Sequence, residues 1–258
     1  MQRGLHPDQV LADPSRGTSR RQLLAAGGAG AAALALARVP GASARGLGRL
    51  GSAVEETLNV AATVEVLTTV VTNLALQKVT LPQAAIDTVG AASREEFDHF
   101  QILTSEFGAR PATKKVWVPD AVFASPTSLF TTLVVGEQIC VNLYLVATTV
   151  AAEAGQVFLT RAMAELVGNE SVHRALARQA LNLQPNDRAF AKYNQPDPAD
   201  GPGSGMAGFT TAQGAIQQFE AAGVGFGTQG AAPGAFYNFD TISPMTPFPS
   251  FVNTLSPA

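Results

Sequence analysis

The stretches REEFDHF (residues 94–100) and NESVHRA (residues 169–175) share one pattern: a Glu stands three residues before a His. The pairs are Glu96 with His99 and Glu170 with His173. Residues at this spacing lie on the same face of an α-helix, about one turn apart. A carboxylate and an imidazole there suit iron, manganese or zinc better than calcium. The alternative is that two helical histidines have Glu neighbours by coincidence.

Two further glutamates lie inside apolar runs of the sequence. Glu65 stands in AATVEVLTT (61–69), and Glu137 stands in TTLVVGEQICV (131–141). Neither run offers a polar helix face that would carry its carboxylate to water. A buried carboxylate destabilises a protein strongly unless it is paired or binds a metal. We therefore expect Glu65 and Glu137 to point inward and to join the two Glu-x-x-His pairs.

These motifs fall on four long stretches, and a helix is expected for each: 55–77, 82–107, 126–154 and 157–183. The first is rich in β-branched residues, which favours a strand, but its uninterrupted length favours a buried helix. Helices of this length need one another to bury their apolar faces. The sequence therefore predicts an all-α fold, a four-helix bundle. Residues 108–125 contain two prolines and no helical period, so we expect a long crossover between the second and third helices.

The N-terminal residues have the features of an export signal. Arg20 and Arg21 precede a weakly hydrophobic, Ala- and Gly-rich stretch, and Ala42-Ser43-Ala44 fits a signal-peptidase site. This pattern resembles a twin-arginine signal. We expect residues 1–44 to be a signal peptide, which would place the mature protein in the periplasm, cell wall or extracellular space. The alternative is an uncleaved anchor, which would be the protein's only association with a membrane.

The C-terminal part differs in composition from the helical part. From residue 185 onward Gly and Pro are frequent, and phenylalanines recur throughout. We expect residues 45–184 to form the helical domain and 185–258 to form an irregular extension packed on it through its aromatic side chains. One short helix is expected at 211–222, where TAQGAIQQFEAA precedes Gly223.

The order of the six candidate ligands along the chain is distinctive. Each of four helices supplies a Glu, and the second and fourth helices each add a His; the residues are Glu65, Glu96, His99, Glu137, Glu170 and His173. This set resembles the carboxylate-bridged di-metal site of the ferritin-like superfamily. With the leader and the Gly/Pro-rich extension, the chain is similar to exported bacterial ferritin-like domain proteins, relatives of plant desiccation-related proteins.

The resemblance implies how the six residues would share two divalent metal ions. Glu65 and His99 would be terminal ligands of one ion, Glu137 and His173 of the other, and Glu96 and Glu170 would bridge. It implies iron, or alternatively manganese, and reaction with O₂ or peroxide in a ferroxidase-like or peroxide-consuming role. The alternatives are a manganese catalase, an oxidase of an organic substrate, or a stress protein that uses the fold as a scaffold without catalysis.

Composition narrows the partners of this chain. The 258 residues carry a formal charge of −3 without a basic cluster, which argues against nucleic acid as a partner. The single cysteine, Cys140, excludes an intrachain disulfide. The long extension makes a closed storage shell less suitable, so we expect a monomer or small oligomer.

Several residues beside the motifs have simpler interpretations than a role in catalysis. Tyr144 lies two helical turns after Glu137 and is interpreted as a core residue, although an electron relay is the alternative. Cys140 is interpreted as a buried, inert thiol. Glu95, Asp98 and Arg174 are interpreted as solvated side chains, with a supporting role beside the ligands as the alternative.

Overall fold

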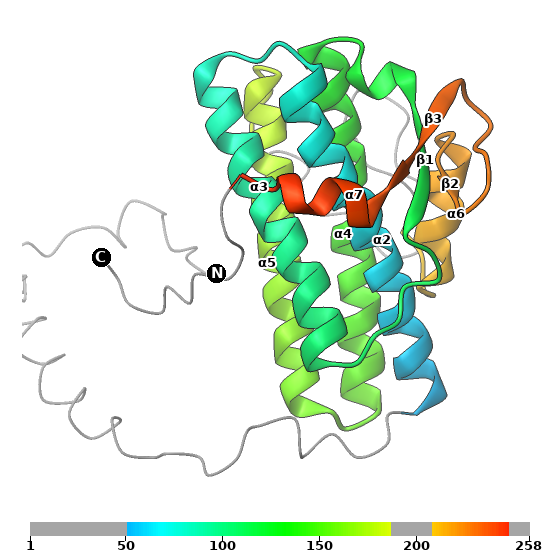
Figure 1. Ribbon diagram of the computed structural model, residues 1–258. Helices are drawn as coiled ribbons and strands as arrows, with labels where there is room; N and C mark the ends of the chain where they lie inside the picture. The colour runs from blue at the N-terminus through cyan, green and yellow to red at the C-terminus, as the bar shows by residue number, and fades with distance from the viewer. Residues whose placement is uncertain (1–50, 187–207, 248–258) are drawn as a thin grey trace, which may run out of the picture. The chain divides into compact units, whose positions relative to one another are not determined.

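The computed structural model describes residues 51–186 and 208–247, and it is mainly helical. Four long helices lie side by side (Figure 1): α2 (Ser52–Lys78), α3 (Gln83–Gln101), α4 (Pro126–Glu153) and α5 (Val157–Ala180). Helix α2 contacts α3 and α4, and α5 contacts the same two helices, so the four enclose one shared core. The predicted signal peptide, residues 1–44, lies outside the described residues.

Helix α2 forms despite its many β-branched residues because it is buried over most of its length. Several of its threonines also satisfy their hydroxyl groups within the helix. Thr63 Oγ1 donates to the Asn59 carbonyl at 2.7 Å, and Thr72 Oγ1 donates to the Thr68 carbonyl at 2.8 Å. This bonding to the preceding turn lets a polar side chain stand in an apolar environment. Burial therefore outweighs the strand propensity of this segment.

Local sequence signals set several helix ends. Pro126 occupies the first turn of α4, and the Ser125 hydroxyl accepts a hydrogen bond from the Ser128 amide at 3.1 Å. Gly155 separates α4 from α5 with φ of 69°, a left-handed conformation that glycine adopts without strain. Helix α3 continues directly into a π-helix, η4 (Ile102–Glu106). Single π-helical turns often accompany functional sites, and this one begins three residues after His99.

The chain also contains a small sheet that the sequence did not predict. The crossover between α3 and α4 holds strand β1 (Lys115–Pro119) and the short 3₁₀ helix η5 (Asp120–Phe123). Strand β1 pairs antiparallel with both β2 (Gly225–Phe226) and β3 (Gly234–Asn238). The expectation of an all-α protein is wrong in this respect. The crossover lacked a helical period because it forms the central strand of a sheet completed by distant residues.

Polar contacts hold the crossover against α2. The backbone amide of Arg110 donates to Asn59 Oδ1 at 2.6 Å, and the amide of Ala112 donates to Thr63 Oγ1 at 2.8 Å. In the sheet, Trp117 Nε1 donates to the Ala232 carbonyl at 2.9 Å. The crossover is therefore fixed both to the helices and to the C-terminal strands.

Residues 208–247 cover the long helices with further short elements. Helix α6 (Gln213–Ala221) contacts α2 and α4, while α7 (Phe239–Ile242) and the 3₁₀ helix η6 (Ser243–Met245) contact α2. The ring of Phe239 lies 4.3 Å from that of Phe100 on α3, measured between centroids. This part of the chain packs its aromatic side chains on the long helices.

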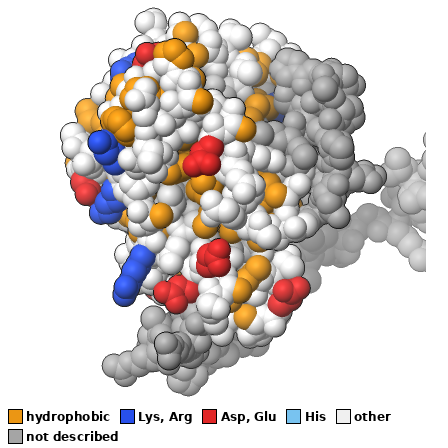
Figure 2. All heavy atoms as spheres, turned by 90° about the vertical axis from the view of Figure 1, so that its right-hand side faces the viewer, with side chains coloured by type: hydrophobic (Ala, Val, Ile, Leu, Met, Phe, Trp, Pro, Cys, Tyr) orange, Lys and Arg blue, Asp and Glu red, His pale blue; other side chains and the backbone are white. Residues whose placement is uncertain are grey.

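Helices α2 and α4 are long and apolar enough to span a bilayer by composition alone. Most residues in the apolar stretch of each helix are buried inside the protein, as is usual for core helices. Figure 2 shows the face that carries the sheet and α6, where charged and apolar side chains are interspersed without an extended patch of one sign.

The contribution of the C-terminal aromatics can be measured with a matched pair of substitutions. Phe239 is 2% exposed and Phe236 is 38% exposed. We expect Phe239→Ala to lower the free energy of unfolding by about 3–5 kcal/mol, because a buried phenyl ring leaves a cavity. Phe236→Ala should cost clearly less. Urea unfolding checks both, and equal effects of the two substitutions would contradict the packing of α7 against α3.

Candidate metal centre

The six candidate ligands meet at one place between the four long helices. Every one of them is at most 6% exposed. Helix α2 supplies Glu65, α3 supplies Glu96 and His99, α4 supplies Glu137, and α5 supplies Glu170 and His173. The expectation that Glu65 and Glu137 point inward is confirmed. Their role as metal ligands remains a prediction at this point.

The six residues form two overlapping groups of four. Glu65, Glu96, His99 and Glu170 place one ligand atom each within 4.8 Å of one another. The second group, formed by Glu96, Glu137, Glu170 and His173, meets the same condition. Each group combines three carboxylates with one imidazole, so each could hold a metal ion. Glu96 and Glu170 belong to both groups.

Both histidines direct Nδ1 toward the carboxylates. His99 Nδ1 lies 3.1 Å from Glu170 Oε1 and 3.8 Å from both Glu65 Oε1 and Glu96 Oε2. His173 Nδ1 lies 3.0 Å from Glu96 Oε1, 3.4 Å from Glu170 Oε2 and 3.9 Å from Glu137 Oε2. The two rings are stacked, with centroids 6.1 Å apart. The donor atoms thus converge from both sides on the two shared glutamates.

These close approaches leave the converging atoms without well-formed hydrogen bonds. Within the described residues, no hydrogen bond reaches either oxygen of Glu96 or Glu170, Oε2 of Glu137, or Nδ1 of either histidine. Buried polar atoms are normally satisfied, and each exception needs an explanation. Carboxylate oxygens and imidazole nitrogens that face one another without hydrogen bonds are the donor set of a cation site. The residues therefore fit one or two metal ions.

The outer nitrogen of each histidine has a partner on another helix. His173 Nε2 lies 2.6 Å from Glu95 Oε2, and His99 Nε2 lies 3.3 Å from Asn169 Nδ2. In the neutral ring, a hydrogen bond from Nε2–H to Glu95 leaves Nδ1 of His173 free to bind a metal, and the contact fixes the ring orientation. Carboxylate–histidine pairs of this kind are typical of metal sites, where they set the tautomer and the basicity of the ligand.

Glu65 is held by two hydroxyl groups. Tyr144 donates a hydrogen bond to Glu65 Oε1, and Thr68 Oγ1 donates to Glu65 Oε2 at 3.0 Å. Tyr144 is completely buried, as expected of a core residue, but its hydroxyl also touches the site. The ring of Tyr144 lies edge-on to His99 with centroids 6.3 Å apart. Tyr144 therefore positions one of the candidate ligands.

The interpretation of Arg174 as a solvated side chain needs correction, because it is only 2% exposed. Glu95 is 49% exposed and also contacts His173, which agrees with the alternative of a supporting role. No signal in the sequence pairs Glu95 with a residue 78 positions away. Asp98 is half-buried, and Cys140 is buried and free, with the pKa of its thiol raised by burial.

Burial and charge move the pKa values of the cluster in opposite directions. Burial, with the charges of Glu96 and Glu170, raises the pKa of Glu65 and of Glu137 well above the usual carboxyl range. Burial would also raise the pKa of Glu170, but the two imidazoles outweigh it and lower that pKa. For His99, burial opposes the charged form, yet Glu170 raises the net pKa. In the metal-free protein these shifts favour the retention of protons by Glu65, Glu137 and His99.

The same shifts predict how the stability of the metal-free protein depends on pH. The raised pKa values of Glu65, Glu137, His99 and His173 mean that the folded state binds more protons than the unfolded state above pH 4.5. Stability falls with pH wherever the folded state holds more protons. For the metal-free protein, kept so by a chelator, the free energy of unfolding should therefore decrease as the pH rises from about 5.5 to about 8.

The lowered pKa of Glu170 acts in the other direction. Its stabilising contribution is present above its unfolded pKa of 4.5 and is lost only as pH falls into the acid range. It therefore does not alter the sign between about pH 5.5 and about pH 8. Urea titrations at several pH values provide the measurement. A free energy of unfolding that is constant or rises over this interval would contradict the protonated cluster.

Comparison with family models, curated proteins and solved structures finds no match for this chain. The interpretation of the site therefore depends on the arrangement of its own residues.

Proposed function

We propose that this chain is a ferritin-like four-helix protein whose buried cluster binds two divalent metal ions. One observation carries the proposal: two groups of four potential ligands share Glu96 and Glu170. A shared pair of carboxylates is the arrangement needed to bridge two adjacent ions. The unsatisfied atoms of the cluster support the same assignment, because a cation would coordinate them.

The assignment of ligands follows the two groups. Glu65 and His99 would belong to one ion, Glu137 and His173 to the other, and the shared glutamates would bridge. Four carboxylates carry about −4 and two divalent ions carry about +4, so the loaded site would be neutral. Neutrality matters here, because an uncompensated charge inside an apolar core is strongly destabilising.

The mixed oxygen and nitrogen donors favour iron, with manganese as the alternative. Two adjacent redox metals held by these six residues would supply chemistry with O₂ or peroxide. The chain's own residues would exclude bulk water through burial, orient His173 through Glu95, and orient Glu65 through Tyr144 and Thr68. We infer a ferroxidase-like or peroxide-consuming role. An oxidase of an organic substrate is the second candidate, favoured by an apolar cavity that reaches Glu137.

We also propose that the protein acts outside the cytoplasm. The support is the paired Arg20 and Arg21 before an apolar stretch and a small-residue cleavage pattern at 42–44. The twin-arginine route carries folded proteins, which is compatible with a metal centre loaded before export.

Elemental analysis and one substitution test the metal site. The full-length chain should bind two metal ions, and a hundredfold excess of free metal over Kd should stabilise it by about 2.7 kcal/mol for each occupied site. Glu137→Gln should reduce the metal content, because a ligand is lost. The same variant should be as stable as the wild type or more stable in a chelator, because a buried carboxyl group no longer repels its neighbours.

The exposed Glu56 on α2 provides the matched control. Glu56→Gln should leave metal content and both melting temperatures unchanged. Thermal unfolding with chelator and with anaerobic Fe²⁺ or Mn²⁺ separates the two effects. Full metal content in Glu137→Gln, or no shift of the wild-type melting temperature with metal, would refute the proposed centre.

A second substitution tests the outer partner of His173. The Glu95 carboxylate has a lowered pKa, chiefly because it accepts the hydrogen bond from His173. Removing such a partner typically weakens metal binding about 10–100-fold. Glu95→Ala should do so, measured by competition with a chromogenic chelator, whereas Glu56→Ala should not. Unchanged affinity in Glu95→Ala would show that this contact does not orient the ligand.

A further inference from the structure

An apolar cavity of about 490 Å³ lies beside the candidate metal centre. Its walls come from α2, from β1 and η5 of the crossover, from α4, and from α6 with the residues that follow it. The cavity is thus formed in part by the elements that the sheet and the C-terminal part add to the long helices, and it opens to solvent beside the exposed Ala121 and Thr127. Its volume falls in the range of small-molecule sites.

The walls are poorly suited to an anion. Apolar side chains predominate, among them Leu67, Val118, Ile139 and Phe219. Two of the threonine hydroxyls already donate their proton within their own helices: Thr72 Oγ1 donates to the Thr68 carbonyl, and Thr132 Oγ1 donates to the Ser128 carbonyl. An anionic ligand would therefore lose much of its hydration with little compensation.

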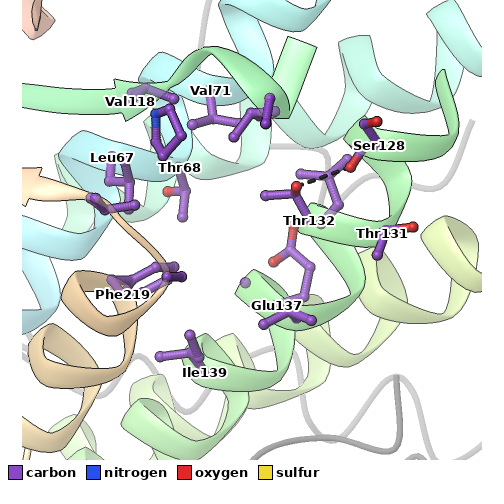
Figure 3. Close-up of a pocket in the computed structure, with 18 of the residues that line it drawn as sticks. Leu67, Thr68, Val71, Val118, Ser128, Thr131, Thr132, Glu137, Ile139 and Phe219 are labelled. Carbon is purple, nitrogen blue, oxygen red and sulfur yellow. Dashed lines mark hydrogen bonds between the residues drawn. The ribbon is translucent and has the colours of Figure 1, made fainter. Parts of the chain in front are cut away.

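Glu137 is the one charged side chain among the described residues that line the cavity. Figure 3 shows its carboxyl group directed into the space bounded by Leu67, Thr68 and Phe219. The same residue belongs to the second ligand group, with Oε2 3.9 Å from His173 Nδ1. A molecule in the cavity would consequently lie next to the metal centre, separated from it by a candidate ligand.

Thr68 makes a second connection between the cavity and the cluster. It lines the cavity, and its hydroxyl donates to Glu65 Oε2 at 3.0 Å. One ligand of each proposed metal ion is thus in contact with the cavity, Glu137 directly and Glu65 through Thr68.

We propose that this cavity binds an uncharged, largely apolar small organic molecule and places it against Glu137, beside the metal centre. This inference rests on the proposed di-metal function and specifies the class of molecule that the centre would meet. The apolar walls select the body of the ligand, and the Glu137 carboxyl group that faces the cavity disfavours anionic analogues of the same length.

Matched ten-carbon probes test the selectivity. Purified full-length protein is titrated with 1-decanol and decanoate in competition with an uncharged, environment-sensitive naphthalene dye. We expect decanol to displace the dye at least tenfold more effectively than decanoate. Failure of decanol to displace the dye, or equal displacement by decanoate, would overturn the proposal.

Two substitutions that fill the cavity test the location. A Cβ atom at Gly136 would lie 3.7 Å from Phe219 Cε1 and meet no other side chain within 4 Å, so Gly136→Leu should project into the cavity without displacing backbone. Ala222→Leu narrows the cavity from the C-terminal part of the chain. Each should weaken decanol binding at least tenfold. Gly168→Leu, at an open position on α5, is the matched control and should bind decanol normally.

Metal content and melting temperature are measured on the same samples, which keeps the two proposals distinguishable. Wild-type decanol affinity in Gly136→Leu and Ala222→Leu would overturn the cavity as the site, even when both metals are bound. Decanol binding that both variants abolish would uphold the site, even when no metal binds and the di-metal function fails. In protein loaded with Co²⁺, decanol should shift the visible absorption of the metal, and an unchanged spectrum would refute its placement beside the centre.

Discussion

Four carboxyl groups and two imidazoles share a space enclosed by apolar side chains, and the arrangement of the four helices depends on that group. Each helix contributes at least one of these residues, so no helix could shift without separating a buried charge from its neighbours. Buried ionised groups are tolerated only when they are paired, protonated or coordinated. The raised pKa values of Glu65 and Glu137 favour the protonated form, and metal binding would provide coordination instead.

The remaining structure explains why the four helices differ in composition. Helices α2 and α4 are apolar on nearly all sides because the crossover, the sheet and α6 cover what the other long helices leave open. Helices α3 and α5 keep solvated faces and are correspondingly richer in charge. Residues 208–247 therefore help to shield the core from solvent. They also form a wall of the cavity, through Phe219 and Val224.

The sequence was sufficient for features encoded locally. Helical spacing identified Glu96 with His99 and Glu170 with His173, and apolar flanks identified Glu65 and Glu137 as buried. Pairings between distant segments leave no such signal. Strand β1 pairs with β3 across more than a hundred residues, and Glu95 meets His173 only because α3 and α5 are neighbours. Arg174 was interpreted as solvated because a single charge on a helix does not reveal which neighbour will cover it.

The two halves of the cluster are related by motif but differ in their surroundings. On one side, Tyr144 and Thr68 fix both oxygens of Glu65 by hydrogen bonds. On the other, Oε2 of Glu137 accepts no hydrogen bond from the described residues, and the side chain borders the cavity. A carboxylate held by fewer contacts can change its position at lower energetic cost. A molecule approaching from the cavity would therefore meet the more adaptable half of the site, while the Glu65 half keeps its geometry.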